Sequence, residues 1–228
     1  MKKALLTAAA SMAMVGGFVA PSHASLMLSL SDGTTSVTIA DGFIGDANPA
    51  AGAVTFIGSI GNFVTNVATA ISYPMLGSPL FPAIDLNSVD VTSSNGGTLT
   101  ISMTDTGFIG SGGPTNFASS VGGTTTAGTI KLDTFLDCGN SAFGTTTPLT
   151  SQSFNTPAFS GGAGTVVAGC GGAYSLTQTF TLTLPGGGTV FSGDAHLAVP
   201  EPSTLASLGA GLLFLAGFGW RRRNNNAA

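Results

Sequence analysis

The clearest pattern in the chain is a strict alternation of apolar and hydroxyl-bearing residues between Tyr174 and Leu184. Apolar residues occupy the even positions, with Gln178 the one interruption, while Ser175 and four threonines occupy the odd positions. A period of two places these sets on opposite faces of a β-strand. The segment therefore predicts a strand with one buried face and one exposed face.

Short segments with the same period follow one another through most of the chain, and glycine-rich turn signals separate them. The further predicted strands are Leu26–Leu30, Ser36–Ala40, Ala53–Ile60, Asn62–Ile71, Leu86–Val91, Thr98–Thr104, Thr129–Phe135 and Thr189–Leu197. The turn signals are Asp32-Gly33, Asp41-Gly42, Asn95-Gly96-Gly97 and Pro185-Gly186-Gly187-Gly188. Since Asn-Gly between alternating runs favours a tight turn, we expect a hairpin at Asn95-Gly96.

Two stretches rich in glycine, serine and threonine, residues 110–129 and 141–172, lack a clear period. We expect long loops or irregular edge strands there. No helical period exceeds two turns between residues 25 and 199. Many short strands with glycine-rich turns predict an all-β fold, an antiparallel β-sandwich of jelly-roll or immunoglobulin-like topology.

The charge of this central region is one-sided. It holds nine aspartates and no Glu or Arg, and Lys131 is its single basic residue. A surface with so few cations cannot neutralise phosphates, which excludes nucleic acid as a partner. It also disfavours adhesion to an anionic membrane surface.

The N-terminus has the charge order of a secretory signal peptide. Two lysines precede an apolar segment from Ala4 to Ala20, and Ser22-His23-Ala24 places small residues where a signal peptidase reads them. We predict that residues 1–24 are a signal peptide, cleaved by signal peptidase between Ala24 and Ser25. Residues 25–199 then form one exported domain.

The C-terminus combines three features in a fixed order: Pro200-Glu201-Pro202, an uncharged apolar run from Leu205 to Trp220, and Arg221-Arg222-Arg223. An apolar run followed by arginines is typical of a stop-transfer segment whose basic end stays cytoplasmic. The whole arrangement, residues 200–223, closely resembles the PEP-CTERM sorting signal of Gram-negative bacteria. This tail is also labelled an ice-binding-protein C-terminal domain, a name that says little about function.

The resemblance implies that an exosortase, a membrane-embedded transpeptidase-like protease, processes the chain at or near the triplet. A transmembrane helix over residues 205–220 would anchor the exported protein in the membrane until then. As a helix this run spans about 24 Å, short of the ~30 Å hydrocarbon core, which favours a processing signal over a permanent anchor. A plain C-terminal anchor is the alternative.

Both cysteines, Cys138 and Cys170, lie in the exported region. Export makes a Cys138–Cys170 disulfide the favoured state, with two free thiols as the alternative. On the chain-entropy account such a bridge stabilises the fold by about 3–4 kcal/mol. A metal site is disfavoured because no histidine or further cysteine is near either residue.

Catalytic signals are poor, and we predict that the protein is not an enzyme and has no cofactor. His196 is the one histidine after residue 24, and we interpret it as a solvated residue of the stalk before Pro200. No G-x-S-x-G elbow, Walker loop, dinucleotide fingerprint or H-E-x-x-H occurs. A glycosidase pair of aspartates is permitted in principle, but most aspartates occupy turn positions.

The same aspartates could bind Ca²⁺, which takes carboxylate and carbonyl oxygens. The best group is Asp41, Asp46 and Asn48, followed by Asp85, Asn87 and Asp90. Neither has the spacing of an EF-hand, so turn capping is favoured and calcium is the alternative.

The leading hypothesis is a non-enzymatic surface or extracellular-matrix protein, sorted by an exosortase and associated with exopolysaccharide or biofilm, as the resemblance implies. The alternative is a carbohydrate-binding or adhesive module, for which Tyr73 and Tyr174 are the tyrosine candidates and Tyr174 is expected to face the core. A hydrolase or an ice-binding surface is the third choice. Regularly spaced threonines suit an ice-binding face but also any exposed strand, and the sequence shows one clean row with no repeat period.

Overall fold

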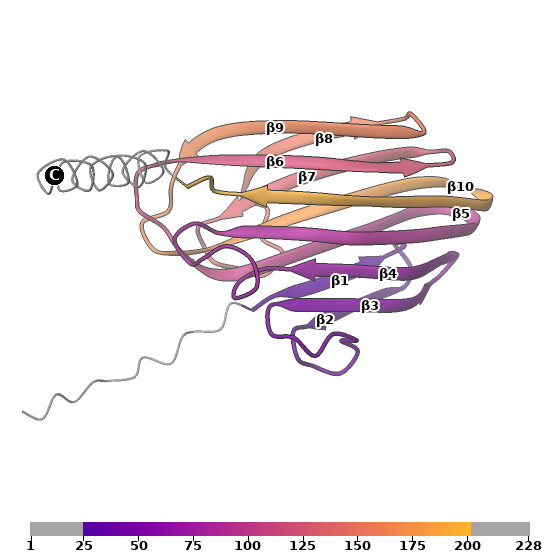
Figure 1. The fold of residues 1–228 in the computed structure, drawn as a ribbon, viewed down its shortest axis with the longest axis horizontal. Helices are drawn as coiled ribbons and strands as arrows, with labels where there is room; N and C mark the ends of the chain where they lie inside the picture. The colour runs from indigo at the N-terminus through magenta and orange to yellow at the C-terminus, as the bar shows by residue number, and fades with distance from the viewer. Residues whose placement is uncertain (1–24, 202–228) are drawn as a thin grey trace, which may run out of the picture.

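The computed structural model describes residues 25–201, which form an all-β sandwich (Figure 1). The predicted signal peptide, the apolar run from Leu205 to Trp220, Pro202 and the three arginines lie outside the described residues. Within the described part, no helix is long and apolar enough to cross a membrane.

Ten strands build the sandwich, and every strand pair is antiparallel. The strands are β1 (Met27–Ser31), β2 (Ser36–Ala40), β3 (Ala53–Ile60), β4 (Phe63–Ile71), β5 (Ala83–Ile109), β6 (Pro114–Thr125), β7 (Thr129–Asp137), β8 (Thr147–Phe154), β9 (Ala158–Ala168) and β10 (Ala173–Ala198).

A ribbon of two long strands, β5 and β10, joins the two layers of the sandwich. The strands pair from Ala173 opposite Ile109 to Ala198 opposite Ala83. In the first half of the ribbon (Ala173–Leu184 of β10 with its partners on β5), β1 and β2 continue the sheet beside β5, and β7 and β8 continue it beside β10. In the second half, from Gly186 of β10 onward, β4 and β3 continue the sheet beside β5, and β6 and β9 continue it beside β10. Each layer is therefore a six-stranded sheet, and the ribbon belongs to both.

The ribbon folds over at a glycine-rich bend. Gly96 and Gly97 have φ angles of 81° and 134°, a region that side chains disfavour. A Cβ at Gly96 would lie 2.9 Å from the backbone N of Gly186 on the facing strand. Glycine is needed here because the strand turns sharply while its partner stays close.

Side chains from both halves of the ribbon meet between the layers. Phe180 from the first half and Phe191 from the second pack edge to face, with ring centroids 5.5 Å apart. Gln178, the residue that interrupts the apolar alternation, is fully buried and donates to the backbone O of Ala195 at 2.9 Å. The core thus lies between the two sheets, and this bond is one of the polar links across it.

The predicted sandwich is confirmed, but two local predictions are wrong. Asn95-Gly96 is not a hairpin, because the strand continues through it and pairs with β10 on both sides. The stretch 110–129 is mostly β6, which lies inside its sheet between β10 and β9 and is neither a loop nor an edge strand. The stretch 141–172 holds β8 and β9, which are outer strands, as one of the two alternatives for it predicts. The small residues that hid the period there pair through backbone hydrogen bonds.

Candidate functional site

The last strand leads directly into the Pro200-Glu201 sequence. β10 ends at Ala198, and the backbone N of Val199 donates to the carbonyl O of Pro82 at 2.9 Å. The loop that contains Pro82 is held to β5 in turn, because Ile109 N donates to Pro79 O at 2.8 Å. Pro200 and Glu201 therefore leave from a fixed point at the end of the sandwich, with no linker between.

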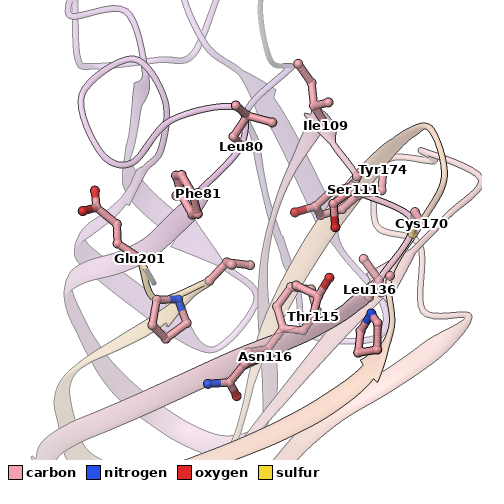
Figure 2. A pocket seen from close by; sticks show the side chains of 16 residues that line it. Leu80, Phe81, Ile109, Ser111, Thr115, Asn116, Leu136, Cys170, Tyr174 and Glu201 are labelled. Carbon is pink, nitrogen blue, oxygen red and sulfur yellow. The ribbon is translucent and has the colours of Figure 1, made fainter. Parts of the chain in front are cut away.

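An open cavity of about 650 Å³ lies at this point of departure (Figure 2). Leu80, Phe81 and Ile109 line one side, and Tyr174 lies deeper, while Pro200 and Glu201 also form part of the lining. Among the described residues around this cavity, Glu201 alone carries a charge. The walls are thus mostly apolar, and part of them comes from the triplet itself.

Tyr174 is buried, as the sequence analysis expects, and its ring lies 5.7 Å from that of Phe108 between centroids. Burial raises the pKa of its hydroxyl to about 12. The other tyrosine, Tyr73, packs against the core. Within residues 25–201 the large exposed aromatic side chain is Phe43, with 71% of its surface accessible. Neither tyrosine forms an open platform for a sugar ring.

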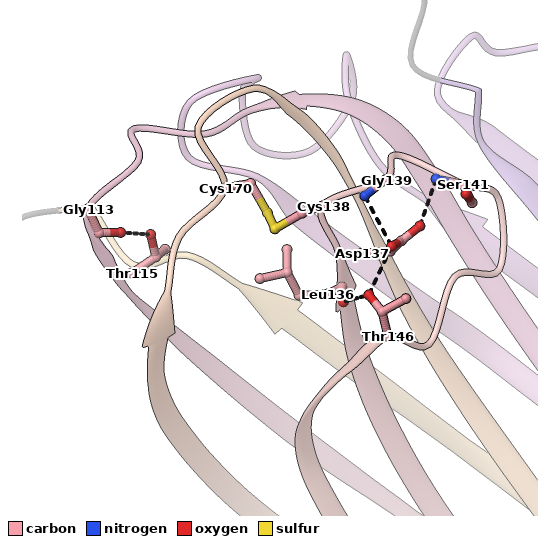
Figure 3. Close-up of a disulfide and its surroundings, with 9 residues drawn as sticks. All are labelled: Gly113, Thr115, Leu136, Asp137, Cys138, Gly139, Ser141, Thr146 and Cys170. Atoms are coloured by element: carbon pink, nitrogen blue, oxygen red, sulfur yellow. Dashed lines mark hydrogen bonds between the residues drawn. A yellow bond between two sulfur atoms is a disulfide. The ribbon is translucent and has the colours of Figure 1, made fainter.

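The predicted Cys138–Cys170 disulfide is confirmed, with the two Cα atoms 5.3 Å apart (Figure 3). It joins the turn after β7 to the turn after β9, at the end of the sandwich where Cys170 and Pro200 line the same cavity. Cys170 is almost fully buried and lines the cavity, and its carbonyl accepts from Gly112 N at 2.9 Å. The bridge therefore holds one wall of the cavity.

Asp137 fixes the loop next to the disulfide (Figure 3). Its carboxylate accepts from the backbone N of Ser141 at 2.9 Å, the backbone N of Gly139 at 3.1 Å and Oγ1 of Thr146 at 2.9 Å. These bonds hold the pKa of Asp137 below its ordinary value, and the bond from the backbone N of Ser141 has the largest effect. This aspartate serves the backbone of the loop.

Residues 198–223 match the PEP-CTERM protein-sorting motif. The chain carries a PEP-CTERM sorting signal. The match begins at the last residue of β10, so the folded domain and the signal meet without a gap. The structure describes Ala198 to Glu201 of the matched residues, which include Pro200 and Glu201 of the PEP-CTERM triplet.

No curated protein matches the chain. Among solved structures it is distantly similar to the carbohydrate-binding module TmCBM61 in complex with β-1,4-galactotriose, at 11% identity over 68% of this chain and 92% of that chain, TM-score 0.32. TmCBM27, described as recognising mannan, is 12% identical over 62% of this chain and 90% of that chain, with a TM-score of 0.28. The enzymatically active domain of bacteriophage CBA120 tailspike protein 4 is 17% identical over 57% of this chain and 18% of that chain, with a TM-score of 0.29. These scores are too low to carry an argument about ligand or activity.

The first calcium candidates, Asp41, Asp46 and Asn48, lie together in the loop between β2 and β3 and cap its turns. Asp46 accepts from the backbone N of Gly42, Asn48 and Thr55 at 2.8–3.1 Å. Asp41 accepts from Gly52 N at 2.6 Å, and Asn48 accepts from Ala50 N at 3.0 Å. In residues 25–201 no group of three or more His, Cys, Asp or Glu side chains could hold a metal ion.

The interpretation of His196 as a stalk residue is wrong, because it lies within β10, as the predicted strand Thr189–Leu197 requires. It is half-buried and pairs with Asp85 on β5 and with Ser120 on β6. Burial raises the pKa of Asp85, and the charge of His196 opposes that rise. The predicted strand is consistent with this position, since Ala195 and Leu197 continue the apolar alternation and place His196 on the outer face.

The second calcium group, Asp85, Asn87 and Asp90, lies on the same outer face. Asp85 and Asn87 line a shallow polar depression with Asp194 of β10. Asp90 accepts from Asn66 Nδ2 at 3.2 Å, a bond that joins β5 to β4. The group is thus divided between the depression and a cross-strand bond.

The threonine row has a second row beside it. Thr177, Thr179, Thr181 and Thr183 of β10 pair with Thr104, Ser102, Thr100 and Thr98 of β5. Hydroxyl bonds join three of these pairs at 2.9–3.2 Å. Thr177 and Thr104 are buried, whereas the other six are partly or fully exposed. The single row of the sequence is therefore half of a wider hydroxyl face, which sequence reading missed because β5 and β10 are far apart in the chain.

Proposed function

We propose that this chain is an exported surface or extracellular-matrix protein, processed by an exosortase and acting without catalysis, in association with exopolysaccharide. The PEP-CTERM motif at residues 198–223 carries this proposal, because such a motif implies export, exosortase processing and a place at the cell surface. The disulfide agrees with it, since disulfides persist in oxidising compartments outside the cytoplasm.

We propose the role without catalysis from the placement of the polar groups. His196 and Asp85 pair across strands on an open sheet face. Asp32, Asp46 and Asp137 each accept several hydrogen bonds within turns or loops, which is a structural use of the carboxylate.

Replacing Glu201 with Ala tests the sorting step. Signal peptidase acts on the other end of the chain, and stop transfer depends on hydrophobicity and on the arginines. The variant should be exported normally but remain uncleaved in the inner membrane. Ser203→Ala, two residues further along, is the matched control and should be processed like the wild type. Membrane fractionation with an antibody against the tail measures both, and normal processing of Glu201→Ala would contradict exosortase recognition of the triplet.

The hydroxyl face favours carbohydrate binding as the second candidate function. Exposed hydroxyls on β5 and β10 can donate to and accept from the hydroxyls of a neutral polysaccharide. Lys131 and Asp133 beside them form an ion pair at 2.8 Å, which leaves little net charge there. Thr181→Lys should weaken retention on neutral polysaccharide recovered from the producing cells, whereas Ser160→Lys on β9 of the other sheet should not. Equal retention of both variants and the wild type would exclude this face.

A further inference from the structure

The apolar side chains where the PEP-CTERM signal leaves the sandwich are unusually exposed for a region so close to its core. Leu80 and Ile109 expose 57% and 53% of their surface, and both line the cavity that Pro200 and Glu201 also line. Phe81 lies between them and the triplet (Figure 2). We call Leu80, Phe81, Ile109 and Pro200 the apolar rim.

The distance from the apolar rim to the sorting run is short. Four residue steps, with three residues between, separate Glu201 from Leu205, the start of the apolar run. Even fully extended they span at most about 14 Å, at roughly 3.3–3.6 Å per residue. The headgroup layer on one side of a bilayer is itself roughly 5–8 Å thick. If the run is in the bilayer, the apolar rim is held at the headgroups or just above them.

The length of the run brings the rim closer still. From Leu205 to Trp220 a helix would span about 24 Å, against a hydrocarbon core of ~30 Å. A short apolar segment is accommodated by local thinning of the bilayer or by drawing its flanking residues toward the hydrocarbon. The flanking residues on the exported side are the triplet and, through the bond from Val199 to Pro82, the loop that carries Leu80.

We infer that the apolar rim is a membrane-contacting surface, which seats the end of the sandwich in the headgroup layer of the outward-facing leaflet before processing. The inference rests on the proposed function, in which the tail is a transient anchor. The contact is apolar rather than electrostatic, because the exported domain has one basic residue and Glu201 alone is charged around the cavity. Seated in this way, the domain presents Glu201 at the membrane surface, where a membrane-embedded protease works.

Depth-dependent quenching of tryptophan fluorescence tests this contact in the full-length chain. Trp220 is the single tryptophan, so Trp220→Phe gives a silent background. Leu80→Trp in that background reports on the apolar rim. Val64→Trp is the matched control, because Val64 is also an exposed apolar residue, at 44%, but lies beside the bend at the opposite end. Each chain is reconstituted into neutral phosphatidylcholine vesicles that carry a quencher at headgroup depth.

We expect quenching at position 80 to be several-fold stronger than at position 64, and Ile109→Trp to repeat the result should Leu80→Trp fold poorly. Equal quenching at the two ends, or none at either rim position, overturns the inference. Quenching at position 80 that requires an added exosortase also overturns it, since the surface then belongs to the protease. A second measurement, on the wild-type chain with an acyl-chain quencher, tests membrane anchoring apart from the rim contact. If Trp220 of the wild type is quenched but the tryptophan of the Leu80→Trp chain is not, membrane anchoring stands and the rim contact fails.

Discussion

Asp105 gives the exported domain a stability that should fall as pH rises. Its side chain is fully buried, and its carboxyl accepts from Ser72 Oγ and from the backbone N of Thr106 at 2.8 Å. Burial raises its pKa from 3.8 to about 7, against the opposing effect of these two bonds. Asp41 nearby adds to the rise because it is also negative.

The sign of this change in stability with pH follows from proton binding. Between pH 3.8 and about 7 the folded state keeps the proton on Asp105 while the unfolded state releases it. The free energy of unfolding therefore decreases with pH over this interval. A difference of about three pKa units corresponds to roughly 4 kcal/mol at full extent. This is a large share of the ~5–15 kcal/mol that stabilises a typical domain.

Asp105→Asn should remove this dependence, because an amide of the same shape stays neutral. We expect residues 25–201 of the wild type to lose a few kcal/mol between pH 4 and pH 8 in urea denaturation, and the variant to lose much less. Asp85, whose pKa is also raised, contributes in the same direction in both proteins and cancels in the comparison. Asp194→Asn, at an exposed site of β10, is the control and should keep nearly the wild-type slope, because Asp194 is the smallest of the influences on the pKa of Asp85. Identical slopes for Asp105→Asn and wild type would refute the reasoning.

Three further predictions concern the disulfide, the turn aspartates and the start of the mature chain. Cys138→Ser/Cys170→Ser should lower the free energy of unfolding by about 4 kcal/mol for a bridge of sequence separation 32, and an unchanged denaturation midpoint would contradict this. Asp46→Ala should cost about 2 kcal/mol through its lost backbone bonds, whereas removing Ca²⁺ with a chelator should leave the wild-type melting temperature unchanged; a fall on chelation would restore the calcium hypothesis. N-terminal sequencing of exported protein should begin at Ser25, and an intact Met1 would remove the export argument.

Much of the sandwich could be predicted from the sequence, because apolar alternation alone identifies strands with one buried face. Tyr174 to Leu184 is such a case. The disulfide could also be predicted, but on a different ground, namely that both cysteines lie in an exported domain. Strands built from small residues could not be found in this way. Gly123 of β6 shows why: a Cβ there would lie 2.5 Å from the carbonyl O of Ser192 and 2.7 Å from the ring of Phe159. The close approach of neighbouring strands selects glycine, and glycine erases the period.

The candidate site, like the fold, could be predicted from the sequence only in part. The PEP-CTERM triplet is a local motif and could be recognised without the fold. The apolar rim could not, because Leu80, Ile109 and Pro200 come together only when loop 72–82, the end of β5 and the end of β10 meet. The Asn95-Gly96 error has the same origin. A local turn signal was correct about a change of direction, but only the facing strand decides whether the chain reverses or the ribbon bends.

The intact mass of protein recovered from the cell surface tests the central claim most directly. One spectrum under non-reducing conditions reports both ends of the chain. The account predicts a species that ends within or beside Pro200-Glu201-Pro202 and therefore lacks the apolar run and Arg221-Arg222-Arg223. A mature surface protein that retains its three arginines would contradict exosortase processing and leave the tail as an ordinary anchor.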